Sequence, residues 1–338
     1  MTDVRPGMRV LIVGGAGLIG HHLALRLKSM GAEPHVVDSL QVNNLGAFAS
    51  LTGDKHSKLY VEFIYERLDL LHRCKIPLHV ADARDYQIMS GVFNDVLPDV
   101  VVHLAAVAHA SQSNKDPYST FDHSLRTLEN TLDIARSRGS QFIYFSSSMV
   151  YGNFEVDEVD EDYPCTPLGI YGALKYGGEK LVIAYQQVFG LPFTIIRPSA
   201  LYGERCVSRR VGQVFIESAL AGRPLTVNGD GSDGLDFTYI DDLIDGVVLC
   251  INNERAYNEV FNLTYGRARS LQEMIEILER EIPNLEVEYQ RRDALMPARG
   301  TLSVSKAQEL LAYEPSWPLE VGLVRYLEWY RGLGVYDV

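Results

Sequence analysis

A tyrosine and a lysine stand four residues apart in the segment YGALKYGGEK, which covers residues 171–180. If this segment is helical, Tyr171 and Lys175 lie on one face of the helix. A phenol with a pKa of about 10 is a poor base at neutral pH, but a neighbouring ammonium group favours the phenolate. The spacing predicts that Tyr171 accepts a proton from an alcohol whose carbon gives up hydride, although a half-buried tyrosine beside a solvated lysine has the same spacing.

Three consecutive serines close the apolar run FIYFSSSMVYG, which covers residues 142–152. Runs rich in Val, Ile, Phe and Tyr are typical of strands, so Ser146, Ser147 and Ser148 stand where a strand ends. Ser147 is predicted to hydrogen-bond the oxygen that Tyr171 deprotonates. The candidate catalytic residues are therefore Ser147, Tyr171 and Lys175.

A glycine-rich turn lies near the amino terminus, in RVLIVGGAGLIGHH, residues 9–22. Taken alone, it fits a flexible turn, a helix cap or close helix packing. Gly14, Gly17 and Gly20 follow an apolar strand and open a helix, where free N–H groups and the helix dipole attract a phosphate. This context predicts a cradle for the pyrophosphate of a dinucleotide.

A second strand, HVVD, ends in Asp38. A carboxylate at this place accepts hydrogen bonds from ribose hydroxyls and repels a 2′-phosphate, which favours NAD over NADP; the same residue also suits a helix cap or a turn. Asp82, in HVADARD after the third strand, is either an adenine contact or a turn residue. We predict NAD as the cofactor.

Apolar runs alternate with helical patterns along the first two thirds of the chain. This alternation predicts an α/β, Rossmann-like doubly wound fold, with a parallel sheet between helices and ligands at the carboxyl ends of the strands. The predicted strands are Arg9–Val13, His35–Val37, Leu78–Ala81, Val100–Leu104, Phe142–Ser146 and Phe193–Arg197, and the predicted helices are Leu18–Met30, Leu125–Arg138 and Tyr171–Phe189.

Two domains are expected in a chain of 338 residues. Residues 1–200 carry the alternating pattern and are assigned to the NAD-binding domain. Residues 201–338 are assigned to a smaller α/β lobe that closes over the crevice and is partly interleaved with the first domain. Residues 41–77 are too many for a plain connection and contain a helical pattern, which predicts an inserted helix.

The overall charge argues against nucleic acid as a partner, because the formal net charge is −13 and the pI is about 5.2. No apolar run reaches the roughly 18 residues of a membrane span, and the polar start resembles no signal peptide. The four cysteines lie far apart without metal-ligand spacing, which predicts a cytoplasmic protein. We assign His103 and His109 to structural roles and expect no metal site.

Motifs along nearly the whole chain resemble the extended short-chain dehydrogenase/reductases, and among them the NAD-dependent nucleotide-sugar epimerase/dehydratase family. The motifs are GGAGLIG, HLAA (103–106), SSSMVYG, YGALK, IIRPSALYGER (195–205), NGDGSDGLDFTYIDDLIDG (228–246) and SVSKAQELLAYEP (303–315). The resemblance implies a nucleoside-diphosphate sugar, with a UDP-sugar favoured, bound between the Rossmann domain and the lobe and oxidised at C4 by NAD. It also implies a homodimer. The implied NAD contacts are Gly14, Gly17, Leu18, Ile19, Gly20, Asp38, Asp82, Ala83, Leu104, Ala105, Ala106, Tyr171, Lys175 and Pro198.

The residues after Ser147 distinguish the branches of this family. Dehydratases resembling it carry an Asp-Glu pair there, whereas this chain has Ser148 and Met149. Neither side chain exchanges protons with a sugar carbon, so the chain resembles the UDP-glucose and UDP-glucuronate 4-epimerases. A net C4 dehydrogenase or 4-ketoreductase, a 4,6-dehydratase with acids from elsewhere, and an NAD-binding scaffold or sensor stay open; the intact Ser147, Tyr171 and Lys175 argue against the last.

Several positions depart from the family pattern. Ala200 replaces a common asparagine, Leu235 replaces a diphosphate-binding arginine, and Ser111 replaces an arginine frequent in enzymes for uronic acids. Arginine suits phosphate recognition; the resemblance favours Arg205 and Arg292, whereas Arg209 and Arg210 are equally well explained as solvated. The predicted substrate contacts are Ser148, Met149, Ser199, Ala200, Arg205, Thr226, Val227 and Arg292.

Overall fold

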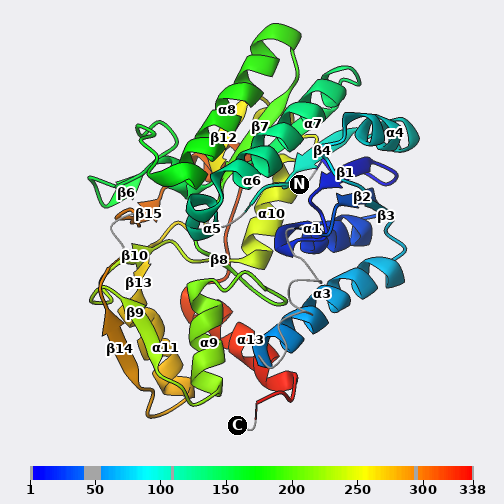
Figure 1. Cartoon of the computed structure of the whole chain (residues 1–338). Helices are drawn as coiled ribbons and strands as arrows, with labels where there is room; N and C mark the ends of the chain where they lie inside the picture. Colours follow the sequence, from blue (N-terminus) through cyan, green and yellow to red (C-terminus); the bar gives the residue numbers. More distant parts are fainter. Residues whose placement is uncertain (1–2, 42–54, 108–109, 293–295, 337–338) are drawn as a thin grey trace.

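The computed structural model describes residues 3–41, 55–107, 110–292 and 296–336. Within these residues a seven-stranded sheet has the order β12-β7-β5-β4-β1-β2-β3, and every neighbouring pair is parallel. The predicted doubly wound α/β fold is therefore confirmed. Figure 1 shows β1 (Arg9–Val13), β2 (Glu33–Asp38), β3 (Leu78–Val80), β4 (Val100–His103), β5 (Gln141–Phe145), β7 (Phe193–Arg197) and β12 (Glu259–Asn262).

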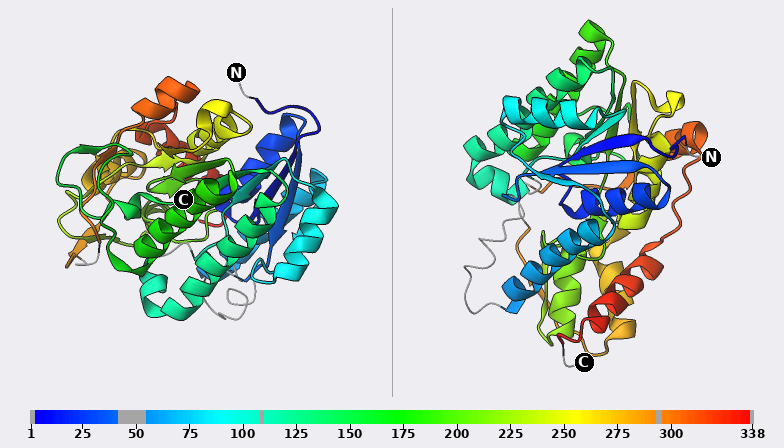
Figure 2. Two further views of the ribbon diagram at one scale, coloured as in Figure 1. Left: turned by 90° about the horizontal axis from the view of Figure 1, so that it is seen from above. Right: turned by 90° about the vertical axis from the view of Figure 1, so that its right-hand side faces the viewer.

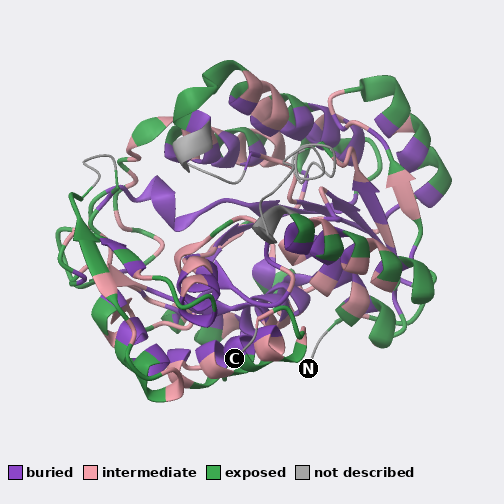
Figure 3. Cartoon of the chain, turned by 60° about the horizontal axis from the view of Figure 1, so that its bottom comes forward, coloured by how far each residue is buried: buried purple, intermediate pink, exposed green. Residues whose placement is uncertain are grey.

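Both faces of the sheet are buried, because alternate side chains of each strand point to opposite faces. On β1, Val10 and Ile12 join one core and Leu11 and Val13 join the other. The first core is closed by α1 (Leu18–Ser29), α3 (Lys55–Arg73) and α10 (Ile240–Cys250), and the second by α4 (Tyr86–Val96), α7 (Thr127–Arg136) and α8 (Gly169–Phe189). Figure 2 shows these strands between the two helical layers, and Figure 3 colours most of their residues as buried.

The strand order reverses beside β1. Its neighbours are β2, which the chain reaches through α1, and β4, which begins the other half of the sheet. In open parallel sheets, ligands bind in the crevice outside the strand ends at such a reversal. The turns after β1 and β4 are therefore the place where a cofactor is expected.

The insertion predicted within residues 41–77 contains α3. Residues 42–54 lie outside the described residues, whereas α3 packs beside α1. On its other side, the Phe63 ring lies 4.8 Å from the ring of Trp329 on α13 (Leu319–Gly332). The insertion therefore joins the sheet domain to the last helix of the chain.

The segment before α7 is helical from an earlier point than predicted. Asp116 caps α6 (Pro117–Phe121) by accepting from the Ser119 backbone N–H, with Pro117 at the first helical position. A π-helical turn, η1 (Asp122–Arg126), then leads into α7. The sequence pair Asp-Pro explains this start, which the apolar periodicity alone does not reveal.

The chain beyond residue 200 forms the lower part of Figure 1 and also returns to the sheet. Both α10 and β12 lie after residue 200 in the sequence but belong to the sheet domain, so the two proposed domains are interleaved there. No helix in the described part of the chain is long and apolar enough to span a bilayer. The remaining elements are α5 (Ala110–Lys115), η2 (Ser148–Val150), β6 (Glu158–Val159), β8 (Leu201–Tyr202), α9 (Val211–Leu220), β9 (Leu225–Asn228), β10 (Gly234–Leu235), β11 (Thr238–Tyr239), η3 (Glu254–Ala256), β13 (Arg269–Ser270), α11 (Leu271–Glu281), β14 (Val287–Gln290), β15 (Thr301–Leu302) and α12 (Ser305–Leu311).

Candidate active site

A cleft of about 1000 Å³ lies at the carboxyl ends of the sheet strands, between the sheet domain and the C-terminal lobe. All three candidate catalytic residues and every predicted NAD contact line it. Of the predicted substrate contacts, Arg205 and Val227 do not line the cleft. Those that do are Ser148, Met149, Ser199, Ala200, Thr226 and Arg292.

The glycine turn after β1 is shaped for close approach to a ligand. Gly14 has φ +81°, and a Cβ there would lie 2.7 Å from the Ala105 backbone N, in the turn after β4. The helix α1 begins after Gly17 with no side-chain cap and no acidic residue in its first turn. Its first N–H groups are therefore available to a phosphate, which fits the pyrophosphate of NAD.

Asp38 ends β2 beside this turn. Its Oδ2 accepts from the Ala16 N–H at 3.0 Å and its Oδ1 from the Leu40 N–H at 2.8 Å. Burial raises the pKa of the carboxyl, while the two N–H groups and Arg67 oppose that rise. A carboxylate has about four acceptor positions, so Asp38 shapes the turn and still has capacity for ribose hydroxyls.

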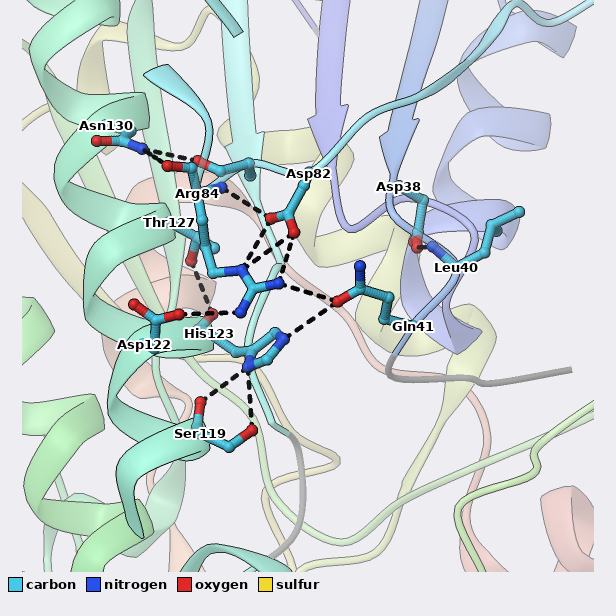
Figure 4. A network of polar contacts seen from close by, with 11 residues as sticks. Asp38, Leu40, Gln41, Asp82, Arg84, Ser119, Asp122, His123, Thr127 and Asn130 are labelled. Atoms are coloured by element: carbon cyan, nitrogen blue, oxygen red, sulfur yellow. Dashed lines mark hydrogen bonds and ion pairs between the residues drawn. The ribbon is translucent and has the colours of Figure 1, made fainter. Parts of the chain in front are cut away.

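Asp82 takes part in a polar network at the same end of the cleft (Figure 4). Arg84 donates to its carboxylate through Nε at 3.0 Å and through Nη2 at 2.6 Å, and these bonds hold the pKa of Asp82 below its usual range. The same guanidinium reaches Asp122 at 2.9 Å and Gln41 at 3.0 Å. The adenine contact assigned to Asp82 stays a prediction, now for a carboxylate held in place by Arg84.

Tyr171 and Ser147 both line the cleft. Ser147 caps η2 by accepting from the Met149 N–H at 3.2 Å, and it also hydrogen-bonds the Tyr171 side chain. Burial raises the pKa of Tyr171, while the Arg210 guanidinium and the bond to Ser147 lower it. The phenol therefore has a polar partner and a cation that both favour its ionised form.

Lys175 lies one turn further along α8. Its Nζ donates to the Phe145 carbonyl at 2.6 Å and lies 5.2 Å from the centre of the Tyr144 ring. Burial lowers the pKa of Lys175 to about 8, and the charge of Glu179 opposes this effect. The ammonium form is therefore still the main form at neutral pH.

The helix α8 approaches the turn after β5 very closely. A Cβ at Gly172 would lie 2.7 Å from the Met149 carbonyl oxygen, so a side chain there would push the helix away. Glu179 links α8 to the ends of two strands. Its carboxylate accepts from Ser146 Oγ, after β5, at 2.5 Å and from Arg197 Nη2, in β7, at 2.7 Å. These contacts bring Tyr171 and Lys175 up to the ends of β5 and β7.

The stretch of the cleft wall that follows Ser147 is uncharged. Ser148 and Met149 are buried there, and Ser148 Oγ donates to Ser199 Oγ at 3.2 Å. Among the described residues that line the cleft, the only carboxylates are Asp38, Asp82 and Asp233. Asp38 follows the glycine turn, Asp82 is held by Arg84, and Asp233 accepts from Arg292 at 2.9 Å.

Arginines gather where the lobe borders the cleft. Arg210, Arg292 and Arg299 all line it, and both other arginines affect the pKa of Arg299, which burial lowers to about 10. The buried Nε atoms of Arg210 and Arg299 have no hydrogen-bond partner in the described structure. Unpaired buried donors are costly, so this corner is suited to an anion.

Arg205 points elsewhere. Its backbone has φ +62°, and its guanidinium donates to His21 Nε2 at 3.0 Å and to Glu66 at 3.3 Å. The diphosphate contact assigned to Arg205 stays a prediction without support from these contacts. Val227 is buried in β9, so a contact with a base would use its backbone only.

Comparison with known proteins identifies the family. Residues 10–264 match the family model described as "NAD dependent epimerase/dehydratase family". The chain belongs to this family, and NAD is its cofactor. A putative UDP-glucose 4-epimerase of Methanocaldococcus jannaschii is 29% identical over 95% of this chain and 98% of the relative.

Two solved structures are similar along the whole chain. A UDP-glucose 4-epimerase of Thermotoga maritima with UDP-glucose has a TM-score of 0.84 and 27% identity, covering 96% of this chain and 99% of that chain. A UDP-glucuronic acid 4-epimerase of Bacillus cereus, in complex with UDP-glucuronic acid and NAD, has a TM-score of 0.85 and 28% identity, covering 96% and 100%.

Four arginines that line the cleft were not assigned to the site from the sequence, namely Arg67, Arg209, Arg210 and Arg299. Arg67 of α3 lines the cleft beside Asp38; its Nε donates to the Arg205 carbonyl at 3.1 Å and its Nη1 to the Ala16 carbonyl at 3.4 Å. For Arg209 and Arg210 the sequence left phosphate binding and solvation equally open, and Arg299 carried no pattern at all. The one available signal for Arg67 was its place on the buried face of the inserted helix.

Proposed function

We propose that this chain is an NAD-dependent nucleotide-sugar 4-epimerase that oxidises C4 of a UDP-sugar transiently and reduces it again on either face. One observation carries the proposal: Ser147, Tyr171 and Lys175 share a cleft with the glycine turn, while uncharged Ser148 and Met149 follow Ser147. The names of the similar proteins, UDP-glucose and UDP-glucuronic acid 4-epimerases, support the UDP-sugar.

The residues around the cleft suit the required proton transfers. The glycine turn and Asp38 would hold NAD, which would supply reversible acceptance of a hydride. The Tyr171 phenolate removes the proton from the C4 hydroxyl, and Ser147 hydrogen-bonds the same oxygen. Lys175 keeps a positive charge near the base, and Tyr171 returns the proton when the carbonyl is reduced.

Reduction of C4 on either face needs room for the keto sugar to turn within the cleft. Ser148, Ser199 and Ala200 are small side chains along the wall of the cleft, and they leave such room. A dehydratase needs an acid and a base at the neighbouring sugar carbons, and none of the three carboxylates that line the described cleft follows Ser147. The uncharged wall therefore favours epimerisation over elimination.

The diphosphate is assigned to the arginine corner of the lobe. Arg292 and Arg299 take the place of the arginine that is missing at Leu235. A guanidinium group suits this role because it donates two parallel hydrogen bonds to phosphate oxygens. Thr226, at the neighbouring strand β9, is assigned to the nucleotide base.

The test is incubation of the purified protein, without added cofactor, with UDP-glucose, UDP-N-acetylglucosamine, UDP-glucuronic acid and UDP-xylose, followed by NMR. We expect one of them to equilibrate with its C4 epimer. Net accumulation of NADH would show a dehydrogenase instead, and a 4-keto-6-deoxy product would show a dehydratase.

A pair of variants on α8 tests the base. Tyr171→Phe is expected to lower turnover at least a thousandfold while NAD stays bound, because the proton acceptor is lost. Tyr176→Phe removes a phenol from the same helix that does not line the cleft, and it should keep wild-type turnover. Equal activities of the two variants would exclude Tyr171 as the base.

We also propose that two copies of the chain pair and that the protein works in the cytoplasm. The end of α8 exposes Val188 and Phe189, which are 70% and 51% exposed, and such apolar side chains suit a contact between copies. All four cysteines are free, as expected in a reducing compartment. Sedimentation of the wild type and of Phe189→Glu tests the pairing; a wild-type monomer would refute it.

A further inference from the structure

A carbonyl group of the glycine turn has a buried side-chain partner of its own. His21, near the start of α1, is fully buried, and its Nδ1 lies 2.8 Å from the Gly17 carbonyl oxygen. A carbonyl oxygen only accepts, so this nitrogen carries the proton and Nε2 is left as an acceptor. Burial lowers the pKa of His21 well below its usual value, which keeps the ring neutral. The ring is therefore a bridge that donates at one end and accepts at the other.

Arg205 supplies the donor for the accepting end of this bridge. Its Nε donates to His21 Nε2 at 3.0 Å, and its side chain is 14% exposed. Its backbone reaches the same turn by a second route, because the Arg205 carbonyl accepts from Arg67 Nε at 3.1 Å and Arg67 Nη1 donates to the Ala16 carbonyl at 3.4 Å. One residue is thus connected to two consecutive carbonyl groups of the turn, those of Ala16 and Gly17.

The remaining contacts of Arg205 hold it against α1 and α3. Its Nη1 donates to Glu66 of α3 at 3.3 Å, and its Nη2 lies 3.3 Å from His22 Nε2. Ala200 and Val207, which come before and after it in the sequence, line the cleft, whereas Arg205 does not. This segment therefore contributes to the cleft wall and places its arginine beside the glycine turn.

Fixing a carbonyl group of the turn also fixes the N–H group next to it. A peptide unit is planar and trans, so its C=O and its N–H point in opposite directions. The Gly17 carbonyl shares its peptide unit with the N–H of Leu18, the first residue of α1, and no side chain caps this helix. Leu18 and Ile19 line the cleft. The bond from His21 therefore sets the direction of an N–H group at the place where the pyrophosphate is expected.

We propose that Arg205 is a positioning residue for NAD: it holds the His21 ring, and the ring orients the first peptide unit of α1 for the pyrophosphate. This role differs from the contact with the sugar diphosphate that the family resemblance predicts for Arg205. It rests on NAD as the cofactor and not on the proposed epimerisation. Retention of NAD thereby depends on a segment that also forms part of the cleft wall.

The experiment measures how fast NAD leaves the purified holoprotein, by exchange against a fluorescent NAD analogue. Arg205→Met is expected to release NAD about tenfold faster, because the His21 ring loses a charge-assisted bond. Arg26→Met is the matched control, since it removes a cation of α1 that pairs with Asp245 at the surface, with side chains 42% and 49% exposed. The control should release NAD at the wild-type rate. Unchanged release from Arg205→Met, or equal acceleration in Arg26→Met, would overturn the proposal.

A second pair of variants separates positioning from a plain charge effect. His21→Ser gives the Gly17 carbonyl another donor, because a serine hydroxyl in a helix can bond to the carbonyl four residues earlier. Whatever the rate of His21→Ser itself, adding Arg205→Met to it should change NAD release less than about twofold, since the two residues act in one chain. If Arg205 attracts the pyrophosphate by its charge alone, the acceleration persists in the double variant and the proposal is wrong.

Calorimetric titration with UDP tests the competing assignment. Arg205→Met should bind UDP as tightly as the wild type does, because Arg205 does not line the cleft. Unchanged NAD release together with about tenfold weaker binding of UDP would make Arg205 a ligand of the diphosphate and overturn the proposal. A wild type that binds no UDP would contradict the proposed substrate only, because NAD release needs no substrate. Arg205→Gln, with the same acceleration expected, replaces Arg205→Met if circular dichroism shows that the latter does not fold.

Discussion

Replacement of Glu179 by glutamine should destabilise the protein strongly. The Glu179 side chain is 2% exposed and forms a two-point pair with Arg197, from Nε at 2.9 Å and Nη2 at 2.7 Å. An amide offers one acceptor oxygen and turns its NH₂ group toward the guanidinium. One or two charge-assisted bonds of about 1.5–3 kcal/mol each are lost, and a broken buried pair costs roughly 3–5 kcal/mol, so we expect a loss of about 4 kcal/mol.

The assay is urea unfolding with saturating NAD, followed by the fluorescence of the two tryptophans. Glu129→Gln is the matched control, because Glu129 pairs with Arg126 on the surface with side chains 55% and 49% exposed. Such pairs contribute at most about 1 kcal/mol. If Glu179→Gln lowers the free energy of unfolding no more than Glu129→Gln does, the reasoning about the buried pair is refuted.

The same substitution has a functional consequence. The charge of Glu179 raises the pKa of Lys175 against the effect of burial, which lowers it to about 8. Without that charge the Lys175 pKa falls further, and less of the lysine is protonated at neutral pH. A pH profile of turnover should therefore show its alkaline limb at lower pH in Glu179→Gln than in the wild type.

Gly14→Ala should leave the purified protein with less than a tenth of its NAD, since the new Cβ would lie 2.7 Å from the Ala105 N; retained NAD, measured after acid release, would contradict this. Arg67→Met removes the donor to the Ala16 carbonyl in the glycine turn, which we assign to NAD. NAD release, measured by stopped-flow exchange, should therefore become about tenfold faster. For Asp236, burial raises the pKa to about 7. Because the pKa of Asp236 is higher in the folded than in the unfolded protein, its contribution to stability falls as pH rises from about 4 to 7. In urea unfolding between pH 5 and 8, the stability of the wild type should therefore fall by about 2 kcal/mol relative to that of Asp236→Asn. Parallel stability curves of the two proteins would contradict the shift.

The parts of the site that the sequence predicts are those governed by local geometry. A glycine turn between strand and helix and a Tyr-Lys spacing on one helix need few distant contacts, so Gly14, Tyr171 and Lys175 line the cleft as expected. Asp38 also lines it, because a strand end at the sheet reversal leads to the same edge.

The arginines show where such prediction stops. A loop arginine is directed by its backbone and by whatever packs around it, and neither is encoded in spacing. Arg205 has a left-handed backbone and contacts His21 and Glu66 instead of the cleft. Arg67 reaches the cleft only because α3 packs beside α1, which is a tertiary contact made across a long insertion.

The position of β12 in the sequence affects folding during synthesis and the choice of fragments that can fold alone. β12 pairs with β7 through residues 259–262, so about sixty residues, which include lobe elements and α10, separate two adjacent strands in the sequence. During synthesis, the edge of β7 stays without its partner until the ribosome has added that stretch and β12 has emerged. An exposed parallel edge can pair with other chains, so a fragment that ends near residue 200 should aggregate rather than yield a separate NAD-binding domain.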